Sequence, residues 1–149
     1  MFSGRFDHAI DEKGRVSIPA RIREVLERDN QESLFITNWT AQGERCLVLY
    51  PPAHWTKMVG KISQRVSLDP AAQLFQMFFI GGAHELQVDR QGRILIPSIL
   101  REYAHLDRDV TFNALTDHFQ LWDKPTLVRI LAAAEQQMMS SEFISKLNL

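Results

Sequence analysis

Hydrophobic and polar residues alternate in four short segments of the chain, which lie in two pairs. Each pair flanks a polar stretch that contains one glycine: residues 8–10 and 16–18 around Gly14, and residues 86–88 and 94–96 around Gly92. Alternation with a period of two is typical of β-strands, and a glycine between two such segments favours a tight turn. The pattern therefore predicts two β-hairpins, with the glycines at turn positions of positive φ.

Each predicted hairpin is followed by a short helix and then by two strands. Pro19 and Pro97 suit the first turn of a helix, and the apolar side of the two helices would be formed by Ile22, Val25, Leu26, Leu100 and Tyr103. The apolar runs that follow are predicted strands, at residues 33–37, 46–50, 110–114 and 119–122. The order of elements is therefore the same in both halves of the chain.

Helical periodicity replaces this pattern in the middle and at the end of the chain. Apolar residues recur at helical spacing from Trp55 to Val66, Asp69 and Pro70 can begin a second helix, and Gly81 and Gly82 can end it. Further helices are predicted from Asp123 and over residues 140–147. The nearly uncharged segment 71–80 is expected to pack on the core in preference to a neighbouring subunit.

A thirteen-residue motif occurs twice. Residues 11–23 return 78 positions later as residues 89–101, and both copies contain the pattern DxxGR, then Ile-Pro, then an arginine four residues after the proline. One chain thus carries two copies of one functional element. Each copy, with its strands, has about 45 residues, which is too few to bury a strong core alone, so we expect the two to fold together or to pack against each other.

These patterns divide the chain into two repeats and two helical segments. The predicted boundaries are residues 5–54 for the first repeat, 55–82 for a helical connector, 83–126 for the second repeat and 127–149 for the C-terminal helices. The fold class expected from them is mainly β with α, that is, α+β.

Composition indicates one soluble globular unit. The chain has 149 residues, 45% of them hydrophobic, and a net charge of −1. Its longest apolar stretch is far shorter than the roughly 20 residues that a membrane span requires, and no secretory signal is visible, so the cytosol is the expected compartment. The single cysteine, Cys46, excludes an intrachain disulfide and is expected to be a buried structural thiol.

Positive charge gathers in the repeated motif. Each copy has a net charge of +2 while the whole chain has −1, which leaves −5 on the remaining 123 residues. A nearly neutral protein can therefore present two basic patches. A narrow turn can approach a DNA groove, where lysine and arginine neutralise phosphates and arginine can also bind guanine.

The candidate DNA-binding residues are the cations of the two turns: Lys13, Arg15, Arg90 and Arg93. Of these, the two residues that follow the glycines, Arg15 and Arg93, are predicted to contact bases or phosphates closely, and Lys13 and Arg90 to contact phosphates. The turns themselves would be formed and supported by Asp11, Gly14, Asp89 and Gly92. Arg5 is a secondary candidate.

Other roles are open for some of these arginines. Arg15 and Arg93 can simply pair with the aspartates four residues before them, and such pairing is compatible with DNA contact. Arg23 and Arg101 are interpreted as residues of a helix surface or of intrachain salt bridges, and not as DNA ligands.

Enzymatic and metal chemistry find little support in the sequence. The five histidines lack the spacing of metal ligands, and one cysteine cannot form a thiolate cluster. No phosphate-binding loop or nucleophile elbow is recognisable. We therefore expect no catalytic residues, no metal, no cofactor, no small-molecule substrate and no membrane partner.

At this point the sequence resembles a known family, the MraZ family of bacterial transcriptional regulators, which contain two SpoVT/AbrB-type DNA-binding elements. The resemblance rests on residues 1–4, on both DxxGR turns with their Ile-Pro, and on residues 46–51 and 119–123. It implies a double swapped-hairpin β-barrel formed by the two repeats, with connecting and C-terminal helices. It also implies ring-shaped homo-oligomers that bind short G-rich direct repeats in the promoter of the division and cell-wall gene cluster, their own gene included. Repression and a place in the nucleoid are the expected outcome and location.

Two other classes of function compete with DNA binding. An antitoxin-like protein would use an AbrB-type element and bind a toxin, although the second element and the helical C-terminus argue against it. A scaffold would use the barrel without its basic turns, and it would tolerate the loss of Arg15 and Arg93.

Overall fold

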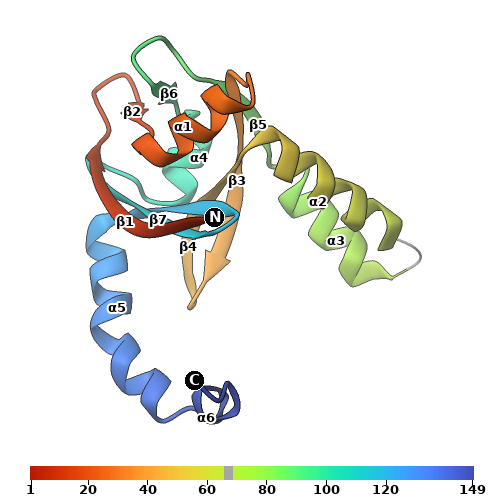
Figure 1. The fold of residues 1–149 in the computed structure, drawn as a ribbon, viewed down its shortest axis with the longest axis vertical. Helices are drawn as coiled ribbons and strands as arrows, with labels where there is room; N and C mark the ends of the chain where they lie inside the picture. The colour runs from red at the N-terminus through yellow and green to blue at the C-terminus, as the bar shows by residue number, and fades with distance from the viewer. Residues whose placement is uncertain (66–68) are drawn as a thin grey trace.

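The computed structural model describes residues 1–65 and 69–149 and has a mixed α+β fold, mostly antiparallel sheet with helices (Figure 1). The elements run in the order β1 (Phe2–Ala9), β2 (Arg15–Ser17), α1 (Ala20–Arg28), β3 (Ser33–Ala41), β4 (Glu44–Tyr50), α2 (Pro52–Arg65), α3 (Pro70–Phe79), β5 (His84–Gln87), β6 (Arg93–Leu95), α4 (Ser98–Tyr103), β7 (Asp109–Thr116), β8 (His118–Asp123), α5 (Lys124–Met139) and α6 (Glu142–Lys146). The predicted fold class and the repeated element order are confirmed. Val66, predicted as part of a helix, lies outside the described residues.

Strands of one repeat pair with strands of the other at several places. In the described part of the chain, six strands form one antiparallel sheet in the order β1-β7-β8-β4-β3-β5, and β2 pairs with β6 separately. Strand β1 therefore lies on β7, β5 on β3 and β4 on β8, each pair joining one repeat to the other. The prediction that the copies fold together is confirmed.

The prediction of two local hairpins is wrong in its strand pairing. The segments on either side of each turn do not form a ladder with each other, because β2 pairs with β6 and β1 pairs with β7. Val16 lies opposite Ile94 in the short ladder, and both side chains are buried. Pairing across the repeats lets each copy cover apolar surface that it could not bury alone.

One core unites both repeats. It is formed by buried side chains from the strands and from the two short helices, among them Ile22, Leu34, Ile36, Leu47, Leu49, Ile96, Leu100, Phe112, Phe119 and Leu121. Helices α1 and α4 begin directly after Pro19 and Pro97, and their predicted apolar sides face this core. The cores of the repeats are therefore not separable.

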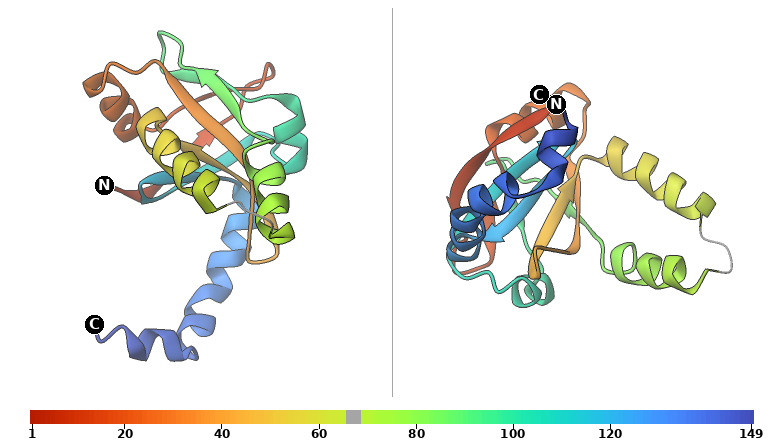
Figure 2. Two further views of the ribbon diagram at one scale, coloured as in Figure 1. Left: turned by 90° about the vertical axis from the view of Figure 1, so that its right-hand side faces the viewer. Right: turned by 90° about the horizontal axis from the view of Figure 1, so that it is seen from below.

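The helical connector projects away from the sheet as a pair of helices (Figures 1 and 2). Asp69 caps α3 by accepting a hydrogen bond from the Ala71 amide at 3.0 Å, as predicted. At the other end of α3, Phe79 is buried and stacks on Trp55 of α2. Phe75 of α3 also contacts Trp39 of β3, whereas Met77 is exposed, so the predicted packing of segment 71–80 holds for one face of the helix only.

The C-terminal helices leave the sheet on a different side (Figure 2). The carboxylate of Asp123 accepts hydrogen bonds from the amide and the hydroxyl of Thr126 and so caps α5. Leu127 packs with Cys46 and Trp122, and α5 then extends away from the sheet toward α6. Among the described residues, no helix is both long and apolar enough to cross a membrane.

Candidate nucleic-acid interface

The first turn is shaped by the carboxylate of Asp11. Its Oδ1 accepts hydrogen bonds from the amides of Lys13 and Arg15, both at 2.9 Å. The Gly14 amide donates to the Asp11 carbonyl at 3.0 Å, and Gly14 has a φ of +88°. An aspartate that binds amides two and four residues on, and a glycine of positive φ, are what the sequence predicted for this turn.

The second turn repeats this geometry. Oδ1 of Asp89 accepts from the amides of Gln91 and Arg93, both at 2.9 Å, and the Gly92 amide donates to the Asp89 carbonyl at 3.0 Å. Gly92 has a φ of +76°. Equal sequence patterns thus give equal hydrogen bonding in the two repeats.

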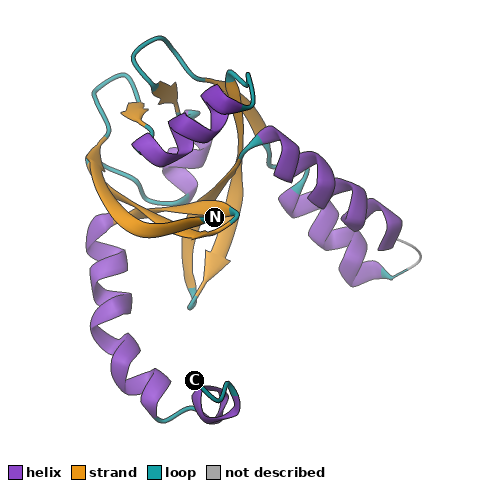
Figure 3. Cartoon of the chain, viewed as in Figure 1, coloured by secondary structure: helices purple, strands orange, loops and turns teal. Residues whose placement is uncertain are grey.

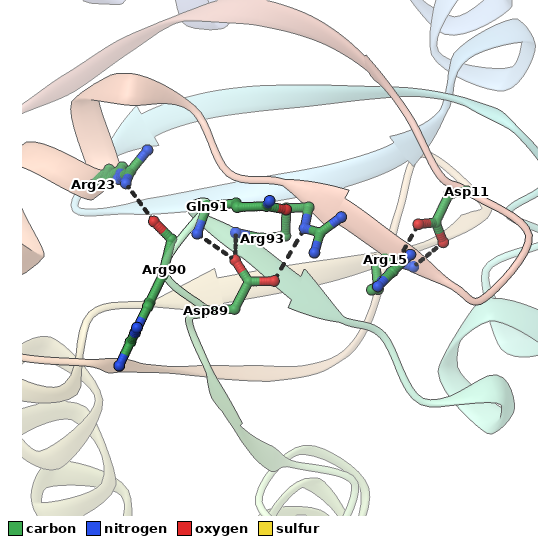
Figure 4. Close-up of polar contacts among 7 residues, drawn as sticks. All are labelled: Asp11, Arg15, Arg23, Asp89, Arg90, Gln91 and Arg93. Carbon is green, nitrogen blue, oxygen red and sulfur yellow. Dashed lines mark hydrogen bonds and ion pairs between the residues drawn. The ribbon is translucent and has the colours of Figure 1, made fainter.

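An ion pair within each turn holds its arginine (Figure 4). Nε of Arg15 lies 2.8 Å from Oδ2 of Asp11, and Nε of Arg93 lies 3.0 Å from Oδ2 of Asp89. The alternative interpretation of these arginines as partners of the aspartates is therefore confirmed. Both guanidinium groups use Nε for the pair, and their side chains keep about a third of their surface exposed. Within the described residues, no ion pair or hydrogen bond is made by their terminal nitrogens.

The hydrogen bonds make both aspartates more acidic than usual. The amide of Arg15, followed in effect by its side chain and the Lys13 amide, lowers the pKa of Asp11 below its ordinary value of 3.8. The amide of Arg93 acts in the same way on the pKa of Asp89. Both carboxylates are consequently charged at neutral pH, and the ion pairs are intact there.

The remaining turn cations lie in the open. Lys13 and Arg90 are exposed, and their side chains have no ion-pair partner in the described part of the chain. Figure 4 shows the Arg90 side chain directed away from the pair formed by Asp89 and Arg93. Both side chains are therefore free to reach a ligand beyond the turn.

Both turns lie at the same end of the molecule. They project side by side from the sheet, on the side away from α5 and α6 (Figures 1 and 3). The two turns that carry the four candidate cations thus lie at one end, although their motifs are 78 positions apart. Arg5 is not among them, because it lies in β1 opposite Asn113 and lines a hollow beside the start of α5.

Two further arginines, Arg23 and Arg101, make intrachain contacts in this region, as expected of residues that are not DNA ligands. Arg23 does pair with Glu27 on its own helix at 3.5 Å, as expected of a helix-surface residue. However, Arg23 also lies against Gly92, and Arg101 lies against Gly14, so each contacts the turn of the other repeat. In the sequence, this contact was indicated only by the recurrence of an arginine four residues after both prolines.

Metal-binding groups are lacking in the described residues, where no three His, Cys, Asp or Glu side chains gather. Cys46 is fully buried, as predicted, and its burial raises the pKa of the thiol to about 12. This cysteine is therefore a core residue.

The fold and the site define a duplicated α+β protein that presents one basic turn from each repeat. A family model described as "MraZ protein, putative antitoxin-like" matches residues 1–78 and again residues 79–144. The chain belongs to the MraZ family.

Similar proteins come from several bacteria, and each is named "Transcriptional regulator MraZ". The relative from Acidithiobacillus ferrooxidans is 41% identical over 125 residues, which cover 83% of both chains. The relative from Syntrophobacter fumaroxidans is 41% identical over 125 residues, 84% of this chain and 81% of its own. That from Coxiella burnetii is 42% identical over 124 residues, 83% of this chain and 80% of its own.

Proposed function

We propose that the protein is a transcriptional regulator that binds double-stranded DNA through its two basic turns. The observation that carries this proposal is the presence, at one end of the molecule, of two equivalent turns in which an aspartate holds an arginine by Nε. The names of the relatives support regulation of transcription.

The geometry of the turns suits two kinds of DNA contact, one with phosphates and one with bases. Lys13 and Arg90 are exposed and can neutralise phosphates with release of counterions. Arg15 and Arg93 are held by their aspartates, so their terminal nitrogens are oriented before binding. A guanidinium fixed in this way can donate two hydrogen bonds to O6 and N7 of guanine, worth about 1 to 3 kcal/mol of discrimination.

The pairing of strands across the repeats supports a double swapped-hairpin β-barrel formed by the proposed repeats 5–54 and 83–126. The proposed helical segments 55–82 and 127–149 would lie outside the barrel. We further propose ring-shaped homo-oligomers that bind short G-rich direct repeats. One turn binds weakly, but linked turns on repeated sites gain avidity of roughly 10²-fold or more. The proposed target is the promoter of the division and cell-wall gene cluster, including the protein's own gene, with repression as the outcome and the cytoplasmic nucleoid as the place.

Binding to the DNA upstream of the protein's own gene tests this proposal. Fluorescence anisotropy over a salt series should show tight binding by the wild type and weak binding by the Arg15→Ala/Arg93→Ala variant. Each lost phosphate contact should flatten the log-log salt slope by about 0.9. The control, Arg65→Ala/Arg129→Ala, removes the same charge from exposed helix positions and should bind nearly as the wild type does.

The proposal fails if the wild type does not bind, or if the turn variant binds as well as the control does. Elution of all three proteins at one size keeps assembly out of the comparison. An antitoxin-like role is the second candidate, because the description of the family model contains that term. A toxin that co-purifies with the protein would favour it. A scaffold role would be favoured if the turn variant retained function.

A further inference from the structure

We propose that Arg101 and Arg23 are positioning residues, each of which holds the DNA-contacting turn of the opposite repeat. This inference rests on the proposed function for its consequence, but the contact itself is a property of the free protein. It would make each turn depend on an arginine from the helix of the other repeat.

The contact between Arg101 and Gly14 is close and flat. A Cβ added to Gly14 would lie 2.8 Å from Cζ, 2.9 Å from Nε and 3.0 Å from Nη2 of Arg101. Because these distances are nearly equal, the face of the guanidinium covers the position that a side chain would occupy. Nε of Arg101 donates to the Ile96 carbonyl at 3.0 Å, which fixes the plane of the group.

The same contact occurs between Arg23 and Gly92. A Cβ on Gly92 would lie 2.7 Å from Nη1 and 2.9 Å from Cζ of Arg23. Nη2 of Arg23 donates to the Arg90 carbonyl at 3.2 Å, within the turn that it covers (Figure 4). Glycine permits this approach because it has no side chain.

Backbone hydrogen bonds reinforce each contact from the same segment. The Ile96 amide donates to the Gly14 carbonyl, and the Ile18 amide donates to the Gly92 carbonyl, both at 2.9 Å. The glycine of one motif is therefore enclosed by the Ile-Pro and the arginine of the other motif. The glycine and the Ile-Pro with its arginine, which are separated within each motif, therefore form the two sides of one contact between motifs. The molecule contains this contact twice.

This arrangement has a consequence for binding. The turn that carries Arg15 is fixed by Arg101, and the turn that carries Arg93 is fixed by Arg23. Loss of Arg101 should therefore misplace Arg15 and leave Arg93 unaffected. An arginine that contacted DNA by itself would instead contribute independently of both.

Double-mutant cycles in the anisotropy assay distinguish these cases. We expect Arg101→Ala to weaken binding about 5-fold in the wild type and in Arg93→Ala, but less than about 2-fold in Arg15→Ala. Arg23→Ala should show the reverse pattern. Arg101→Lys keeps the charge but lacks the planar group, so it should resemble Arg101→Ala. Equal effects in both backgrounds, or full activity of the lysine variant, would overturn the proposal.

Hydrogen exchange in the absence of DNA gives a second, independent readout. Arg101→Ala should accelerate exchange at the amides of residues 12–15 and leave residues 90–93 unchanged, and Arg23→Ala should do the opposite. Arg21→Ala, which removes an exposed arginine of α1, is the control. If an alanine variant unfolds, the lysine variant replaces it.

Acceleration at both turns, at neither, or at the turn of the same repeat contradicts the positioning role. If the wild type does not bind the DNA, the proposed function fails, but the exchange experiment still decides whether the contact holds the turns.

Discussion

At the scale of the residue, the conformation of each turn depends on one carboxylate. Asp11 accepts from two amides and a guanidinium, and Asp89 does the same. Protonation would remove the charge that attracts all three donors. The conformation of the turn and the orientation of its arginine therefore both depend on the ionisation of the same aspartate.

A pH dependence of stability follows from this link. The folded-state pKa of Asp11 and Asp89 lies below the unfolded value, so folding binds fewer protons at these groups. Their contribution is complete above the unfolded pKa, near 3.8, and is lost as the pH falls through the lower folded-state pKa. In urea unfolding, the free energy of unfolding of the wild type should fall as the pH is lowered into the acid range. The Asp11→Asn/Asp89→Asn variant should show a smaller fall, because it lacks the two titrating carboxylates. Parallel pH curves for the two proteins would contradict the prediction.

Contacts within a turn could be predicted from the sequence, whereas contacts between the two repeats could not. Positive φ at Gly14 and the pairing of Asp11 with Arg15 follow from residue type and from a spacing of four. The contact of Arg101 with Gly14 joins residues far apart in the chain. A single sequence contains no distance information of that kind, so only the recurrence of the arginine pointed to a role.

At the scale of the element, period two identified strands but not their partners. Alternation predicts which face of a strand is buried but not which strand it pairs with. Strand β2 buries the same face when it pairs with β6 as it would if it paired with β1. The helices were more predictable, because caps are local: Asp69 and Asp123 each bind an amide of the helix that they begin. What a helix packs against is again a long-range property, as α3 illustrates.

Helix α3 offers a matched test of its packing. Phe79 is 3% exposed and Met77 is 73% exposed on the same helix. Phe79→Ala should lower the free energy of unfolding by about 3 to 5 kcal/mol, because it leaves a cavity among Trp55 and the neighbouring aromatic residues. Met77→Ala should change it by less than about 0.5 kcal/mol. Urea unfolding monitored by circular dichroism measures both. A Met77→Ala effect that grows with protein concentration would mean that this face is covered by another subunit.

At the scale of the whole molecule, the two repeats depend on each other for their strand pairing and for their core. Strands β1, β2 and β4 of the first repeat find partners in β7, β6 and β8 of the second. Because the copies share one core, the two basic turns are held at a fixed separation within one chain.

This interdependence can be tested by dividing the chain between its repeats. A fragment of residues 1–78 keeps the pairing of β3 with β4. It loses β7, β6 and β8, which pair with β1, β2 and β4 in the whole chain. As a monomer it should therefore lack cooperative unfolding, since too little apolar surface is buried to offset the entropy of ordering. Mixing it with residues 79–149 should restore the circular dichroism spectrum and a cooperative transition at the mass of a one-to-one complex. Because the repeats are equivalent in pattern, the fragment alone can acquire structure only by pairing with a second copy of itself, which would show as a concentration-dependent dimer. A cooperatively folded monomer of residues 1–78 would mean that the exchanged strands are dispensable, and that the two turns are held by their own repeats.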